Sequence, residues 1–147
     1  MAHAAFHQLL PEIAKTELRS VILAPQNQYG IAPGTYAFIE LYCDDLTCDC
    51  RNVYIYVTNL QTKATEATIT YGWEPLTFYM DWMGIDDKND ATINDFKGPS
   101  LYAFGQQGHY TKHWLKFFKE TLKSDRPYAK RLERHYQQVK SFIASKK

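Results

Sequence analysis

Three cysteines stand within eight residues of this sequence, in the segment CDDLTCDCR at 43–51, and the chain has no others. If the flanking segments pair as strands, this segment is the tip of a hairpin, and the turn brings the thiols together. Neighbouring thiolates repel one another and favour a bound cation. Zinc matches them best because it is tetrahedral, redox-inert and bound by sulfur at roughly 2.3 Å. The spacing C-x4-C-x-C, which differs from the paired C-x2-C knuckle of common zinc folds, therefore predicts a zinc site at Cys43, Cys48 and Cys50.

A tetrahedral site needs a fourth ligand, and no fourth cysteine is present. His109 and His113 are four residues apart near the start of a predicted helix, so both side chains can face one way. One of these two is the predicted fourth ligand. Another reading leaves the position open for water or substrate, which is the catalytic arrangement. The other side chains within reach by sequence are His3 and His7, which repeat the spacing, and the loop residues Asp44, Asp45 and Asp49.

Three hypotheses for the cysteines need no metal: reduced structural thiols, redox chemistry and a disulfide. Cys43 can be an ordinary buried thiol at a strand end, or it can form a cross-strand disulfide with Cys50 that leaves Cys48 free. The aspartates of the loop raise the pKa of nearby thiols because negative neighbours disfavour thiolate. They therefore argue against a reactive nucleophile and for a bound cation.

The pattern of hydrophobic residues predicts the strands and helices that position this loop. Strands rich in Tyr, Ile, Val and Thr are predicted at 35–43, 52–60 and 64–73, joined as an antiparallel meander. Helices are predicted at 3–15 with an interruption at Pro11, at 74–85, near 90–96, at 113–124 and at 127–143. The fold class is α+β, an antiparallel sheet of three to four strands packed by C-terminal helices, in a single domain over 1–147. The last two helices carry a core stripe of Trp114, Leu115, Phe118, Leu122, Tyr128, Leu132, Tyr136, Val139 and Ile143.

Alternation along the strands divides their side chains between two faces. The aliphatic face is predicted to be the core, with Ala37, Ile39, Leu41 and Cys43 on the first strand and Val53, Ile55 and Val57 on the second. The opposite face is aromatic, with Tyr36, Phe38, Tyr42, Tyr54 and Tyr56. Because such a face is seldom left bare in water, helices of the same chain or a second copy are expected to cover it.

Composition and charge predict where in the cell the protein is located. No run of 18 or more apolar residues is present, which predicts no membrane span, and the first residues do not form a secretory signal. A cytoplasmic location is therefore predicted, where thiols stay reduced. The net charge of +1 hides an asymmetry: residues 1–111 hold 6 basic and 13 acidic residues, whereas 112–147 hold 11 and 3.

This asymmetry supports an alternative function, binding of nucleic acid or an acidic partner by the basic C-terminal helices. The plainer reading is that these are solvated helix faces, or that the tail docks on the acidic body of its own or a neighbouring chain; a homodimer is a mild expectation. A third reading is a metal-dependent hydrolase that uses a cysteine-bound metal, a histidine and Glu40. No phosphate-binding loop, G-x-S-x-G or H-E-x-x-H motif supports an enzyme.

The segment GTYAFIELYCDDLTCDCRNVYIYV (34–57), with GPSL (98–101) and RLERHYQQVK (131–140), resembles a family of uncharacterised bacterial proteins. This resemblance implies a bacterial, cytoplasmic, stand-alone domain and brings no activity with it. The Cys-x-Cys pair is also similar to the small SEC-C zinc motif. The Gly-rich and Cys/His segments that follow in that motif are missing here, so its ligands are not transferred. The leading prediction is a zinc-binding protein with an interaction or regulatory role.

Overall fold

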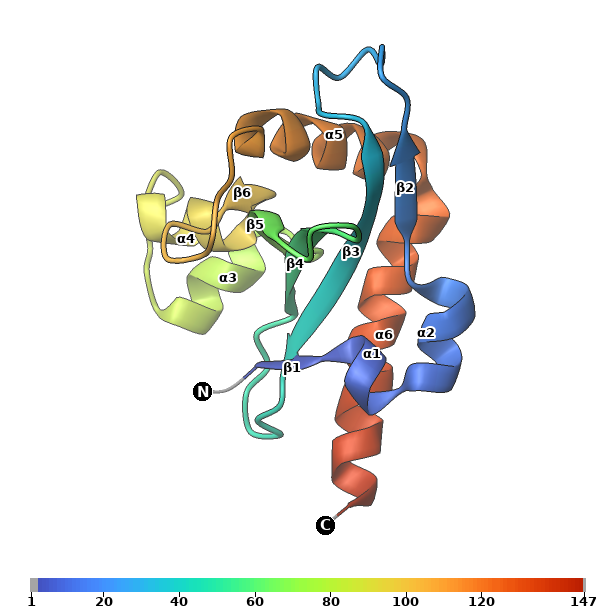
Figure 1. Ribbon diagram of the computed structural model, residues 1–147. Helices are drawn as coiled ribbons and strands as arrows, with labels where there is room; N and C mark the ends of the chain where they lie inside the picture. Colours follow the sequence, from blue (N-terminus) through green and yellow to red (C-terminus); the bar gives the residue numbers. More distant parts are fainter. Residues whose placement is uncertain (1–2, 147) are drawn as a thin grey trace.

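The computed structural model describes residues 3–146 (Figure 1). Its strands are β1 (His3–Ala5), β2 (Ser20–Leu23), β3 (Gly34–Cys43), β4 (Asn52–Asn59), β5 (Thr65–Gly72) and β6 (Ser100–Leu101). Its helices are α1 (Phe6–Leu9), α2 (Pro11–Glu17), α3 (Leu76–Met83), α4 (Ala91–Lys97), α5 (Thr111–Ser124) and α6 (Arg126–Ser145). No helix in the described range is both long and apolar enough to cross a membrane.

The strands form one antiparallel sheet in the order β1-β3-β4-β5-β6, and β2 pairs with the start of β3. The predicted α+β class and the β3-β4-β5 meander are confirmed. The prediction of three to four strands is wrong, because the sheet has six. The additional strands β1, β2 and β6 have only two to four residues, which is too short for alternation to show in the sequence.

The N-terminal segment differs from its prediction. Residues 3–5 are a strand beside β3 and not part of a helix, whereas the interruption predicted at Pro11 is confirmed, because α1 ends at Leu9 and α2 begins at Pro11. Pro11 is the first residue of α2, a position where the missing N–H of proline leaves no helix hydrogen bond unmade. The strand β1 places His3 beside the cysteine loop, because His3 is paired with Cys43.

The core lies on the aromatic face of β3, which corrects the predicted assignment of its faces. Tyr36, Phe38 and Tyr42 are at most 2 % exposed. On the other face Ala37 and Cys43 are buried as predicted, whereas Ile39 and Leu41 are only half-buried. Phe38 is paired with Val57, so the aromatic residues of β3 share a face with the aliphatic residues of β4. The prediction that Val53, Ile55 and Val57 are core residues is confirmed.

Helices α5 and α6 cover this core face, as expected for an aromatic sheet surface. Phe38 makes edge-on contacts with Trp114 and Phe118 of α5, each at 5.9 Å between ring centroids. Of the predicted stripes, Trp114, Phe118, Leu122, Tyr128, Leu132, Tyr136 and Val139 are buried, and Leu115 and Ile143 pack against them partly buried. Figure 1 shows α6 running along β3 to the end where the 43–51 loop lies.

Candidate metal centre

The three cysteines meet at the tip of the β3–β4 hairpin. Cys43 ends β3, and Cys48 and Cys50 lie in the loop before β4. Their Sγ atoms are within 4.8 Å of one another, and within residues 3–146 no other group of three or more His, Cys, Asp or Glu ligand atoms comes this close. All three thiols are free, so the alternative of a Cys43–Cys50 disulfide is wrong for this structure. Around one tetrahedral zinc, sulfur atoms lie about 3.8 Å apart, so the cluster needs only a small contraction.

A turn at Asp45 folds the loop so that Cys48 returns to Cys43. The Asp45 carboxylate accepts hydrogen bonds from the backbone N–H and the hydroxyl of Thr47, at 2.9 and 2.7 Å. These two bonds lower the pKa of Asp45 below its usual value. The backbone N–H of Cys48 then donates to the Asp45 carbonyl at 3.1 Å. Such an Asx turn is set by local sequence, independently of any metal.

Arg51 fixes the other end of the loop, next to Cys50. Its backbone has φ +45°, an uncommon conformation for a residue with a side chain. The hydroxyl of Tyr79 donates a hydrogen bond to the Arg51 carbonyl at 2.7 Å, and the backbone N–H of Arg51 donates to the Tyr136 hydroxyl at 3.3 Å. Its guanidinium pairs with Asp49 and Glu74, both at 2.9 Å. Helices α3 and α6 thus hold Cys50 in place through the residue that follows it.

Lys140 of α6 supplies a positive charge beside the thiols. Its ammonium donates to the carbonyl oxygens of Asp45 and Cys48, at 2.7 and 3.2 Å, and lies 5.2 Å from the centroid of the Tyr136 ring. This charge lowers the pKa of Cys43 and Cys50, but less than other causes raise it. One side chain therefore ties the loop to the helix and offsets part of the charge that thiolates would carry.

Without a cation, the buried thiols are protonated at neutral pH. Burial is the main cause that raises the pKa of Cys43, and burial together with the neighbouring sulfurs raises that of Cys50 to about 12. Thiols of this kind are poor nucleophiles, because the thiolate is the reactive form. A metal ion would displace these protons, so binding would be coupled to proton release and would strengthen as pH rises.

The predicted fourth ligands His109 and His113 are not brought to the cysteines. His113 lies in the first turn of α5 beside Gly30, where its Cδ2 is 3.4 Å from the position that a Cβ atom at residue 30 would occupy. Gly30 precedes the start of β3, whereas Cys43 ends it, and ten residues of strand span roughly 30 Å. Figure 1 shows α5 and the 43–51 loop at opposite ends of β3.

A different histidine is near the cluster. His3 is the register partner of Cys43 in the β1–β3 ladder, so the two side chains project from the same face of the sheet. Its ring stacks on Tyr54 at 4.4 Å and 12°, and burial lowers its pKa. The spacing of His3 and His7 was visible in the sequence, but the pairing of His3 with Cys43 depends on a three-residue strand that the pattern did not show.

Glu40, the acid of the predicted hydrolase, lies away from the cysteines on the core face of β3 and is 0 % exposed. It accepts a hydrogen bond from the Tyr42 hydroxyl at 2.7 Å and is 2.6 Å from Nδ1 of His135. The other ring nitrogen of His135 is 2.7 Å from Glu17. This carboxylate–imidazole–carboxylate row braces α6 against the sheet and gives Glu40 no access to substrate.

Comparisons with models of protein families, with curated proteins and with solved structures found no match for this chain.

Proposed function

We propose that this protein binds one zinc ion through Cys43, Cys48 and Cys50, and that the bound ion gives the hairpin tip an interaction or regulatory role. The observation that carries this proposal is the close approach of three free Sγ atoms on a loop that other contacts already hold in shape. A preformed trio of soft ligands favours a thiophilic cation over calcium or magnesium, which prefer oxygen.

His3 is the fourth ligand in this proposal. It faces the same side of the sheet as its partner Cys43, and a change of side-chain rotamer would move its ring from Tyr54 toward the sulfurs. Three thiolates and one imidazole form a common closed set for structural zinc. A closed site supports a role in holding or presenting the loop, where Leu46 is exposed, more than a role in catalysis.

Metal content tests the proposal directly. Protein purified without an affinity tag or added metal is expected to contain about one zinc per chain by elemental mass spectrometry, and Cys48→Ser is expected to contain little. Cys48 is the right position because it is the least buried of the three, so its loss disturbs the core least. A wild-type protein that stays metal-free after incubation with zinc would refute the proposal.

The fourth ligand needs a separate test. The cobalt form of the wild type is expected to show the visible bands of a tetrahedral site with three sulfur ligands and one nitrogen ligand, and zinc affinity is expected to fall at least tenfold in His3→Ala. His113→Ala is the matched control, since that ring lies at the other end of β3, and it is expected to bind zinc as the wild type does. Equal affinities in both variants would leave the cysteine site standing and remove His3 from it.

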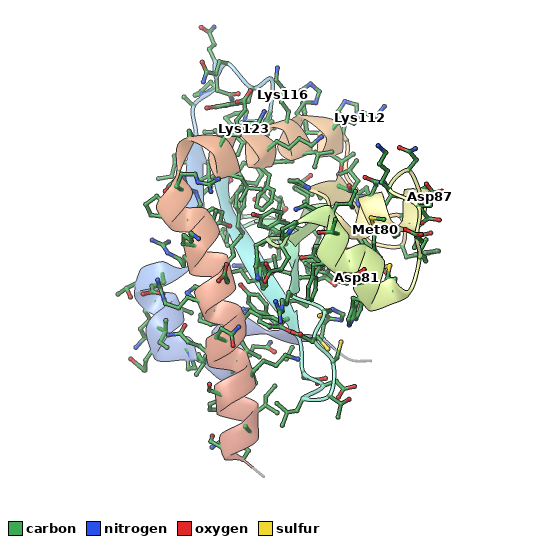
Figure 2. All side chains as sticks on the ribbon, turned by 180° about the vertical axis from the view of Figure 1, so that it is seen from behind. Met80, Asp81, Asp87, Lys112, Lys116 and Lys123 are labelled. Carbon is green, nitrogen blue, oxygen red and sulfur yellow. The ribbon has the colours of Figure 1, made fainter. Side chains whose placement is uncertain are left out.

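A second candidate function, nucleic-acid binding, is supported by an exposed lysine stripe on α5. Its members recur at helical spacing and make no ion pair among the residues that the structure describes: Lys112, Lys116, Lys119 and Lys123. Figure 2 shows three of them along the outside of the helix. Four phosphate contacts predict that log K for an oligothymidylate falls with log salt at a slope of about −3. A salt-independent or undetectable interaction would exclude this candidate.

A further inference from the structure

A pocket of about 260 Å³ opens on the face of the sheet that α5 and α6 leave uncovered. It lies between β4, α4 and the segment after β6, and Tyr54 and its register partner Thr70 form its floor. Aromatic and polar side chains make its walls, chief among them Tyr54, Asp95, Phe96, Tyr102 and Phe104. None of these residues belongs to the cysteine cluster.

The rings of the pocket belong to two groups of aromatic contacts. Tyr102 stacks on Tyr54 at 4.8 Å and 27°, and Phe104 packs edge-on against Tyr102 at 5.8 Å. Phe96 stacks on Trp82 at 5.5 Å. Phe104 is nevertheless 89 % exposed, although a phenyl side chain gains free energy when it is buried. Burial of the Phe104 ring therefore contributes little to folding, whereas a ligand held at the pocket mouth would cover the ring.

The electrostatic surroundings favour a cation. Residues 76–97, which contribute Met83, Asp95 and Phe96 to the pocket wall, contain five aspartates and two lysines. The nearest lysine, Lys97, is turned away: its ammonium donates to the Gly72 carbonyl at 2.8 Å and lies 5.7 Å from the Tyr71 ring. In the described part of the chain, no lysine or arginine lines the pocket, and the Asp95 carboxylate has no hydrogen-bond or salt-bridge partner.

We infer that this pocket binds a small organic ammonium ion, with Phe96, Tyr102 and Phe104 around the cationic head and Asp95 at its edge. Tyr54 serves only as the floor, because His3 stacks on one of its faces and Tyr102 on the other. The faces of aromatic rings attract cations, most strongly when water is excluded. A carboxylate at the rim adds Coulomb attraction and disfavours anions. A hard metal ion would need several oxygen ligands, which the aromatic walls do not supply. None of the cysteines lines the pocket, and its one link to the proposed zinc site is the stacking of His3 on Tyr54.

The experiment compares two probes of the same shape, choline and its uncharged isostere 3,3-dimethylbutan-1-ol. A difference in their affinities measures the contribution of the positive charge to binding. Titration of the full chain, followed by NMR chemical shifts of the pocket residues, is expected to show choline binding with a dissociation constant roughly fivefold or more below that of the isostere. Equal affinity for the two probes would identify a merely apolar pocket and overturn the inference. Absence of binding by choline at tens of millimolar would overturn it as well.

Two variants test the residues. Phe104→Leu and Asp95→Asn are each expected to weaken choline binding severalfold, and neither side chain is needed for folding because both are exposed. Phe142→Leu and Asp81→Asn are the matched controls: they make the same chemical changes at residues that do not line the pocket. They are expected to leave affinity within twofold. A loss of the same size in all four variants would contradict a site at these rings.

Discussion

Lys140 affects both the shape of the cysteine loop and the pKa of its buried thiols. In the proposed site, one zinc ion with three thiolates and a neutral imidazole would have a net charge of −1, and two carbonyl oxygens of the loop hold the Lys140 ammonium beside the thiols. The same charge lowers the pKa of the buried thiols. Removing it therefore weakens both the shape of the loop and the deprotonation that metal binding requires.

Replacement of Lys140 by methionine keeps the length of the side chain and removes its charge. Zinc affinity is expected to fall about tenfold, the usual scale for outer-sphere partners of a metal site, and half-saturation at fixed zinc is expected to need a higher pH. Competition with a chromophoric chelator over a pH series measures both effects. Lys130→Met, a substitution at an exposed position of the same helix, is the control. Equal zinc affinities for the two variants would show that Lys140 does not contribute to metal binding.

Glu17 gives a prediction about acid stability. Its hydrogen bond with buried His135 is the largest cause that lowers its pKa below 4.5, and Arg134 adds to the effect. A depressed folded-state pKa contributes stability above pH 4.5 that is lost as pH falls through the folded value. Glu17→Gln is expected to lower the free energy of unfolding by about 1 kcal/mol at neutral pH and to flatten its decline below pH 4.5.

Urea denaturation at a series of pH values tests this expectation. The control is Glu12→Gln, because Glu12 makes only an exposed contact with Lys15. Its profile is expected to parallel that of the wild type. Parallel profiles for all three proteins would mean that the Glu17–His135 contact contributes nothing to acid stability.

At the scale of elements, the orientation of β3 decides what the helices cover. Phe38→Ala is expected to cost about 3–5 kcal/mol, the usual range for a large aromatic lost from a core, because Phe38 is 0 % exposed against α5 and α6. Ile39→Ala, one residue away on the half-buried face, is expected to cost about 1 kcal/mol. Thermal or urea unfolding of the two variants measures the difference. A larger loss of stability in Ile39→Ala than in Phe38→Ala would show that the core lies on the aliphatic face of β3.

These two residues also show how far sequence reasoning reaches. Alternation correctly located β3 and its partner, but both faces of β3 are apolar, so the pattern could not say which one faces inward. The answer lies in α5 and α6, whose own rings complement Phe38. The cysteine cluster was predictable because it is local to one hairpin. The position of His3 was not, since it depends on a strand of three residues pairing across 40 residues of sequence.

At the scale of the whole molecule, opposite charges occupy different surfaces. Figure 2 shows Lys112, Lys116 and Lys123 along α5, and Asp81 and Asp87 on α3 and the segment after it. The net charge is only +1, so mutual repulsion between molecules is weak. Such a surface favours head-to-tail contacts in which the lysine stripe of one copy meets the aspartates of the next.

Self-association is therefore expected to depend on salt. The screening length is about 30 Å at 0.01 M salt and about 8 Å at 0.15 M, so the apparent mass by sedimentation is expected to exceed 17.1 kDa at the lower ionic strength and to return to it at the higher. Lys116→Gln with Lys123→Gln is expected to abolish the increase, whereas Lys130→Gln on α6 leaves it. Association that persists in salt would instead indicate an apolar contact, for which exposed Ile22 and Phe104 are the candidates.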